Sequence, residues 1–121
     1  MNNMKQKIPN IKDCDIGRII KRDFPNSNAN DIRLLLHLYN SESKKGGNRV
    51  WASILKLSNG DIDMLKQYIE KANNDFRDVI MLSEYPNYSK HMFGDSLSKK
   101  DKNQLIVQDW EQYELWLLSC K

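Results

Sequence analysis

The stretch from Gly46 to Pro86 constrains the fold most, because it holds three apolar patterns of helical period in close succession. The spacing predicts helices over 49–58 and about 62–73, and a third that Pro86 ends. The positions expected to face inward are Val50, Trp51, Ile54, Leu55 and Leu57, then Ile62, Leu65, Tyr68, Ile69 and Ala72, then Phe76, Val79, Ile80 and Leu82. Connections of two or three residues force such helices to pack on one another.

Start and stop signals separate the three patterns. Asn59-Gly60 predicts the end of the first helix, since glycine enters the left-handed conformation without steric cost. Asp61 follows as an N-cap whose carboxylate can accept from the free amides of the next turn. Asn74 or Asp75 is predicted to cap the third helix.

Two further helices are predicted before this stretch. Asp13 or Asp15 is expected to cap a helix that Pro25 stops, and Asn28 or Asn30 to cap the next, over about 30–40. The second of these is apolar on more than half its circumference, through Ile32, Leu34, Leu35, Leu36, Leu38 and Tyr39. A helix of that kind is normally surrounded by others, so it is expected at the centre of the bundle.

The last predicted helix, from Ser98 to about Cys120, is the longest, with Ser98 as its cap. A seam of coiled-coil spacing runs along it through Ile106, Trp110, Tyr113, Leu117 and Cys120. Leu105, Leu115, Trp116 and Leu118 lie beside or opposite this seam, so the end of the helix is apolar nearly all round. Either it is buried within the monomer, or part of it contacts another chain, and Trp and Tyr are enriched in such contacts.

These patterns predict an all-α, single-domain bundle of five or six helices with a long C-terminal helix. The 121 residues are enough for one domain with one core, and residues 1–10 are expected to form a flexible arm. The N-terminus has no apolar run, so neither a secretory signal nor a membrane span is predicted, and the expected location is cytoplasmic. Cys14 and Cys120 are then expected to be reduced thiols.

Residues that usually carry catalysis or bind metals are few. His37 and His91 are the only histidines, and neither belongs to a metal-ligand spacing. His37 is expected at the edge of the core and His91 in solvent. No acid–base or nucleophile pattern is visible, so the sequence predicts a protein that is not an enzyme and has no metal or cofactor.

Two short segments are weak candidates for a binding site. The loop Lys44-Lys45-Gly46-Gly47, with Arg49 beyond it, runs into a helix start, where free amides and basic side chains suit a phosphate or another anion. The simpler interpretation is a solvated loop.

Glu84-Tyr85-Pro86, at the end of a helix, could place a carboxylate and a phenol along a groove. The simpler interpretation there is a tyrosine packed on the bundle.

The segments GGNRVWASILKLSNGDIDMLKQYI and DFRDVIMLSEYP resemble a family of small bacterial proteins of unknown function. Its members have a helix of the type RVQLAILKL, a Gly-Asp start and an RDVL…EYP ending. The resemblance covers Phe24 to Pro86, and Trp51 stands where the family pattern has a polar residue. It implies a compact helical domain of bacterial origin and no particular activity.

The function predicted from the sequence is binding of a protein partner or of a second copy, through Trp110, Tyr113, Trp116 and Leu117. The alternative is an anion or nucleic-acid binder that uses Lys44, Lys45, Gly46, Gly47 and Arg49 with the lysines of 99–102. The net charge of +3 is too small to favour nucleic acid. Salt discriminates the two, since affinity for nucleic acid falls steeply as salt rises.

Overall fold

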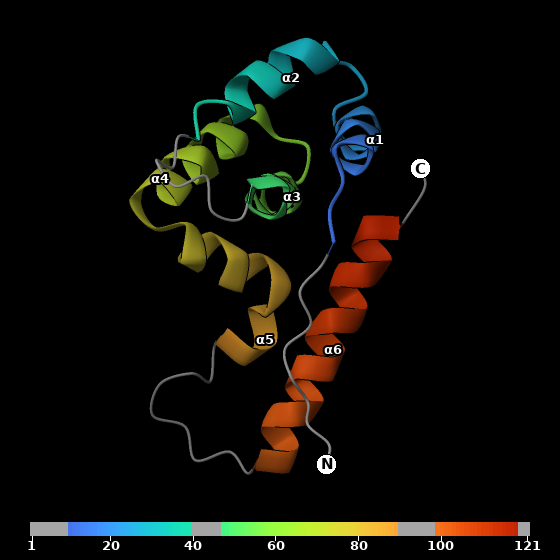
Figure 1. Ribbon diagram of the computed structural model, residues 1–121, viewed down its shortest axis with the longest axis vertical. Coiled ribbons are helices and arrows are strands. Elements are labelled where there is room, and N and C mark those ends of the chain that lie inside the picture. Colours follow the sequence, from blue (N-terminus) through green and yellow to red (C-terminus); the bar gives the residue numbers. More distant parts are fainter. Residues whose placement is uncertain (1–9, 40–46, 90–98, 119–121) are drawn as a thin grey trace.

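The computed structural model describes residues 10–39, 47–89 and 99–118, and within these ranges the chain forms six helices and no strand (Figure 1). They are α1 (Asp13–Asp23), α2 (Ala29–Leu36), α3 (Gly47–Ser58), α4 (Ile62–Glu84), α5 (Pro86–Ser89) and α6 (Lys99–Leu118). The prediction of an all-α, single-domain bundle with a long C-terminal helix is confirmed. Four predictions fall on residues outside the described ranges: the cap at Ser98, the end of the seam at Cys120, the position of His91 in solvent, and residues 1–9 of the expected arm.

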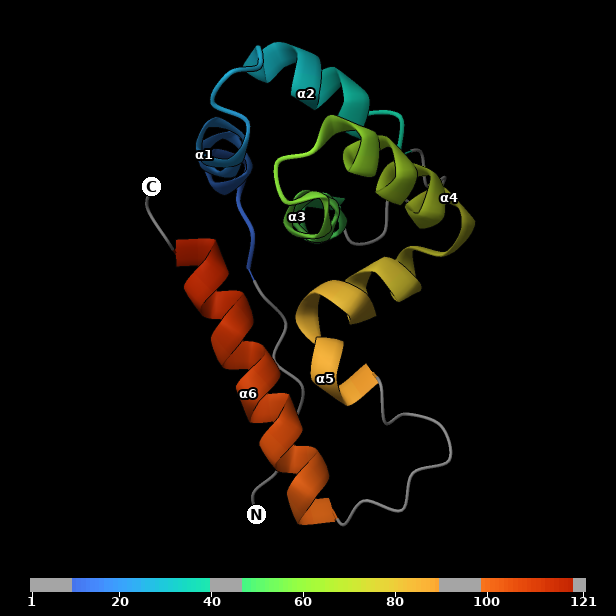
Figure 2. The same ribbon diagram turned by 180° about the vertical axis from the view of Figure 1, so that it is seen from behind.

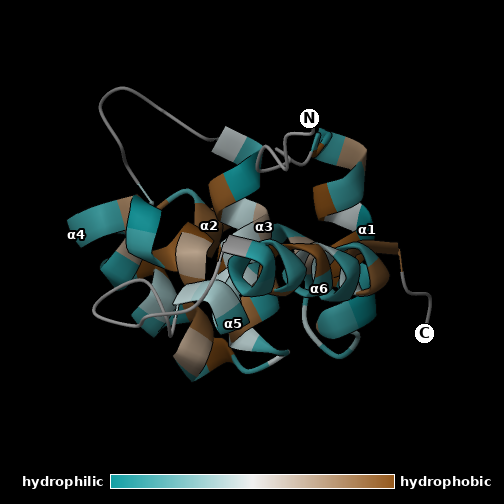
Figure 3. Cartoon of the chain, turned by 90° about the horizontal axis from the view of Figure 1, so that it is seen from below, coloured by the Kyte–Doolittle hydropathy of each residue, from teal (hydrophilic) through white to brown (hydrophobic). Residues whose placement is uncertain are grey.

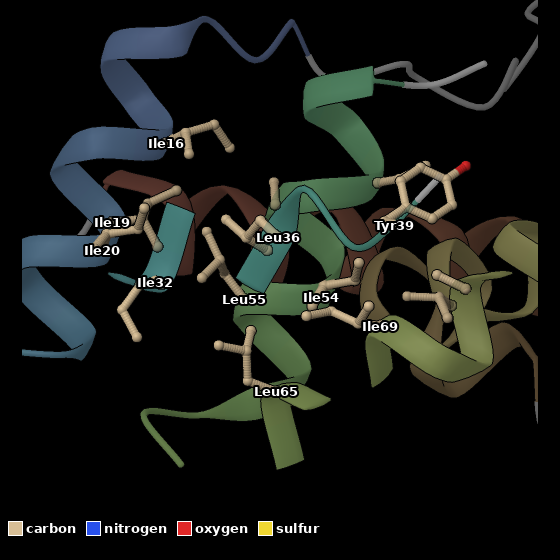
Figure 4. Close-up of a cluster of buried hydrophobic side chains, with 14 of the residues drawn as sticks. Ile16, Ile19, Ile20, Ile32, Leu36, Tyr39, Ile54, Leu55, Leu65 and Ile69 are labelled. Atoms are coloured by element: carbon tan, nitrogen blue, oxygen red, sulfur yellow. The ribbon is translucent and has the colours of Figure 1, made fainter. Parts of the chain in front are cut away.

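Helix α3 lies at the centre of the bundle, with α1, α2 and α4 around it (Figure 1). Val50, Ile54 and Leu55 have no exposed surface. Figure 4 shows the side chains that meet there: Ile16, Ile19 and Ile20 of α1, Ile32 and Leu36 of α2, Ile54 and Leu55 of α3, and Leu65 and Ile69 of α4.

The expectation that the helix of residues 30–40 occupies the centre is wrong. Helix α2 buries Ile32 and Leu36, which lie one turn apart, while Leu34 and Leu38 are 66% and 60% exposed. The helix is eight residues long and lies across one end of the bundle, so only one of its faces meets the core (Figure 2). The helix has more apolar residues than the fold buries, and composition alone does not reveal which face of the helix is the buried one.

The local signals between α3 and α4 act as predicted. Asn59 and Gly60 have φ values of 50° and 80°, which end α3, and the Asp61 carboxylate accepts a hydrogen bond from the Met64 amide at 3.1 Å. A side chain at Gly60 would also collide with helix α1, because its Cβ would lie 2.7 Å from the Asp23 carbonyl oxygen. Glycine is therefore required here both for backbone conformation and for close packing.

Helix α4 contains a break where the sequence predicts a new helix start. Asp75 leaves helical geometry (φ −157°, ψ 100°), and its carboxylate accepts from the Arg77 amide at 3.1 Å. Asp75 is therefore the cap of the second half. That half ends at Glu84, as the following proline predicts, and Pro86 opens the short helix α5.

The caps of the first two helices match the sequence in part. Asn28 caps α2, its side chain accepting from the Asn30 amide at 2.8 Å. In α1 the N-cap position is Lys12, and Asp15 accepts from the Lys12 amide at 3.0 Å from within the first turn. The carboxylate at Asp15 thus satisfies a free amide without occupying the cap itself.

Helix α6 runs along one side of the molecule, beside α5 at its middle and beside α1 near its end (Figures 1 and 2). Asp109 and Tyr113 are fully buried on its inner side. Hydrophilic and hydrophobic residues are mixed around its circumference (Figure 3), because several large apolar side chains lie on the outer side as well.

Candidate functional site

The two weak candidate segments of the sequence meet in a single ion pair. The Arg49 guanidinium, in the first turns of α3, donates from Nε and Nη2 to the two carboxylate oxygens of Glu84, at 2.8 and 2.7 Å. Glu84 is 1% exposed and Arg49 25% exposed at their side chains. The hydrogen bonds to Glu84 raise the pKa of Arg49 above its ordinary value. The contact fastens the start of α3 to the end of α4.

This pairing bears on the predicted anion site. Lys44, Lys45 and Gly46 lie outside the described residues, and Gly47, with φ of 31°, begins α3. Arg49 already binds a carboxylate in bidentate geometry, so an external anion would have to displace Glu84 from it. Any anion binding by this loop therefore depends on its lysines.

A second polar contact joins α6 to α5. The Asp109 carboxylate, fully buried, accepts hydrogen bonds from the backbone amides of Asn87 at 3.1 Å and Tyr88 at 2.8 Å. Gln112 Nε2 adds a hydrogen bond to the Ser83 carbonyl at 3.2 Å. A carboxylate at the start of α5 satisfies amides that have no partner within the helix. The contact gives Asp109, an acidic residue in the C-terminal half of α6, a role in joining α6 to α5.

We expect Asp109→Ala to lower the free energy of unfolding by about 1–3 kcal/mol, because two partly buried amides lose their acceptor. Asp109→Asn keeps one acceptor oxygen and should cost less. Urea unfolding followed by circular dichroism measures both changes. A loss for Asp109→Asn as large as that for Asp109→Ala would contradict the capping role.

Two tyrosines, Tyr85 and Tyr113, lie near the Arg49–Glu84 pair, where α3, α4 and α6 meet. Tyr113 has no exposed surface and Tyr85 is 2% exposed. Burial, followed by the negative charge of Glu84, raises the pKa of both phenols, so they remain protonated at neutral pH. The Tyr113 hydroxyl has no hydrogen-bond partner within the described residues. The two buried phenols and the Arg49–Glu84 pair join these helices.

Lys56 gives the junction a pH dependence. Burial lowers its pKa, opposed by the charge of Asp109, so the folded state binds the proton less readily than the unfolded state. The ammonium therefore costs stability at pH 7, and this cost disappears as pH rises from the lowered pKa to the ordinary lysine value near 10.5.

We expect Lys56→Met to stabilise the protein at pH 7, with the gain shrinking toward pH 10.5. Urea unfolding of both proteins at the two pH values tests this, and an equal difference at both would contradict it.

The residues predicted to bind a partner lie on the inner side of α6. Tyr113 is fully buried, with Trp110 stacked on it at 6.2 Å and Trp116 tilted against it at 5.5 Å between ring centroids. The Arg22 guanidinium lies 5.1 Å from the Trp116 ring and donates to the Trp116 carbonyl at 2.6 Å. Leu117 packs against the core. This set contacts the chain's own helices, and Tyr113 offers no surface to a partner.

The opposite side of α6 carries the exposed apolar residues. We define the outer face of α6 by the exposed residues Lys100, Gln104, Val107, Glu111, Glu114, Leu115 and Leu118; Asp101 and Gln108 are exposed as well and lie along one edge of this face. Within it Val107 is 40% exposed, Leu115 73% and Leu118 65%. Val107, Leu115 and Leu118 are spaced eight and three residues apart, which keeps them on one side of a helix, but the aromatic seam on the other side was the stronger pattern in the sequence.

The described residues contain no group of three or more His, Cys, Asp or Glu side chains that could hold a metal ion. His37 is exposed and meets the Trp51 ring edge-on at 4.8 Å, at the edge of the core. Cys14 is an exposed free thiol. No helix within the described ranges is both long enough and apolar enough to cross a membrane.

Fold and site together define an all-α bundle with a buried ion pair at one helix junction and an exposed, partly apolar face on its longest helix. Comparison of the chain with protein-family models, with curated proteins and with solved structures found no match. The resemblance over Phe24 to Pro86 therefore stays a prediction, and the function is argued from the residues themselves.

Proposed function

We propose that this chain is a non-enzymatic binding domain that presents the outer face of α6 to another protein chain. The observation that supports it is the exposure of Val107, Leu115 and Leu118 on a helix whose inner side is already packed on the core. Large aliphatic side chains in a row on a helix, flanked by charges, suit a contact with a second amphipathic element. Covering one such leucine contributes about 1.5–3 kcal/mol.

The proposal places the contact on the side of α6 opposite to the aromatic residues that the sequence favoured. Trp116 and Leu117 support the contact from behind by anchoring α6 to the bundle. A helix held in place on one side offers a rigid surface on the other, and rigidity lowers the entropy lost on binding.

Site-specific photo-crosslinking in the cell of origin tests the proposal. A photoreactive amino acid replaces Leu115, and a matched control replaces Glu70, an exposed residue on α4 far along the chain from the outer face of α6. We expect a cross-linked protein product at position 115 and none at position 70. No product at 115, or equal products at both positions, would refute the proposal.

A further inference from the structure

We infer that the outer face of α6 binds a second copy of this chain, with the two α6 helices antiparallel about a twofold axis near Val107. This inference rests on the proposed function and names its partner. It is carried by the order of charges along the outer face, which is basic at one end and acidic at the other. Two such faces place opposite charges beside each other only when the two helices run antiparallel.

The charges on this face run in one direction. Lys100 lies in the first turn of α6, while Glu111 and Glu114 lie in the last third. Within residues 10–39, 47–89 and 99–118 none of these three side chains forms an ion pair. A cation near a helix start and anions toward its end both oppose the helix macrodipole. Asp101, in the same first turn, offsets Lys100, so the unfavourable charges that remain in the isolated chain are the two glutamates toward the helix end.

An antiparallel second copy reverses this cost. The acidic end of one helix then lies beside the basic start of the other, and the two macrodipoles oppose each other. A parallel pair would instead place lysine beside lysine and glutamate beside glutamate. The charge order thus selects the antiparallel arrangement over the parallel one.

The spacing fits a twofold axis. Lys100 lies seven residues before Val107 and Glu114 seven residues after it. All three therefore lie along one line of the helix, with Val107 about 10 Å from each of the other two. With Val107 of each copy on the axis, Lys100 of each copy lies opposite Glu114 of the other. Leu115 is then beside the aliphatic stem of that lysine, which can cover it. Such a contact is isologous, as twofold interfaces are.

Charge reversal tests the inference, with oligomeric state measured by sedimentation over a range of protein concentration. We expect the wild type to show a reversible monomer–dimer equilibrium. Lys100→Glu and Glu114→Lys should each raise the dimer dissociation constant about tenfold or more, because each creates two like-charge contacts. The matched control Lys71→Glu, an exposed reversal on α4, should leave it unchanged.

Mixing the two single variants is the decisive step. In a heterodimer of Lys100→Glu with Glu114→Lys, both contacts again join opposite charges, so the equimolar mixture should dimerise like the wild type. A wild type that stays monomeric at all concentrations would overturn the inference, as would a mixture no better than either variant alone. A monomeric wild type that still cross-links to a different protein through position 115 would end this inference and leave the proposed function standing.

Discussion

Arg49→Met is expected to lower the free energy of unfolding by about 3 kcal/mol, the lower end of the range for breaking a buried ion pair. The reason is the burial of its partner: Glu84 is 1% exposed and would lose the cation that pairs with it. Glu84→Gln should cost less, because Arg49 is 25% exposed and can be hydrated in part. Urea unfolding followed by circular dichroism measures both values.

Two controls make this result specific. The double variant Arg49→Met/Glu84→Gln removes both charges together and should recover part of the loss. Arg77→Met breaks the exposed pair with Asp75, whose arginine side chain is 78% exposed, and should cost no more than about 1 kcal/mol. If Arg77→Met cost as much as Arg49→Met, burial would not be the cause.

The Arg49–Glu84 pair also marks the limit of what the sequence could predict. Both residues were singled out, but for separate sites, because their pairing depends on how α3 and α4 cross after the chain has turned at Gly60. Charge and helix position are local properties. The partner of a charge is a property of the tertiary fold.

Local chemistry, by contrast, was readable wherever one residue decides the backbone. Asn59 and Gly60 ended a helix, and Asp61 and Asp75 capped the next two, because each signal acts within four residues of itself. In the sequence Asp109 is an acidic residue in the second half of the last helix, and nothing near it in the chain reveals a role. Its role needed the start of α5 to be positioned beside it.

Which helix lies at the centre of the bundle is likewise a property of the tertiary fold and not of the local sequence. The sequence favoured residues 30–40 because they are apolar on more than half of the helix circumference, and the helix of residues 49–58 has an apolar pattern on one face. Packing decides otherwise: α3 is covered by α1, α2 and α4, while α2 meets the core with one face (Figure 1). Apolar content measures what can be buried, whereas the connections between helices determine what is.

Two leucines test this difference in position directly. Leu55 on α3 has no exposed surface, and Leu34 on α2 is 66% exposed. Leu55→Ala is expected to lower the free energy of unfolding by about 2–5 kcal/mol, through lost burial and the cavity left among tightly packed neighbours. Leu34→Ala removes the same atoms from a solvated position and should change it by no more than about 0.5 kcal/mol.

Urea unfolding of the two variants under one set of conditions gives the comparison. Near-equal losses in the free energy of unfolding would contradict the view that α3 is central and α2 peripheral. The pair is informative because the substitutions are chemically identical and both helices are rich in apolar residues. Any large difference between them must then come from the surroundings of each leucine. If Leu55→Ala alone is costly, the core is assembled around α3, and the exposed leucines of α2 contribute little to the stability of the monomer.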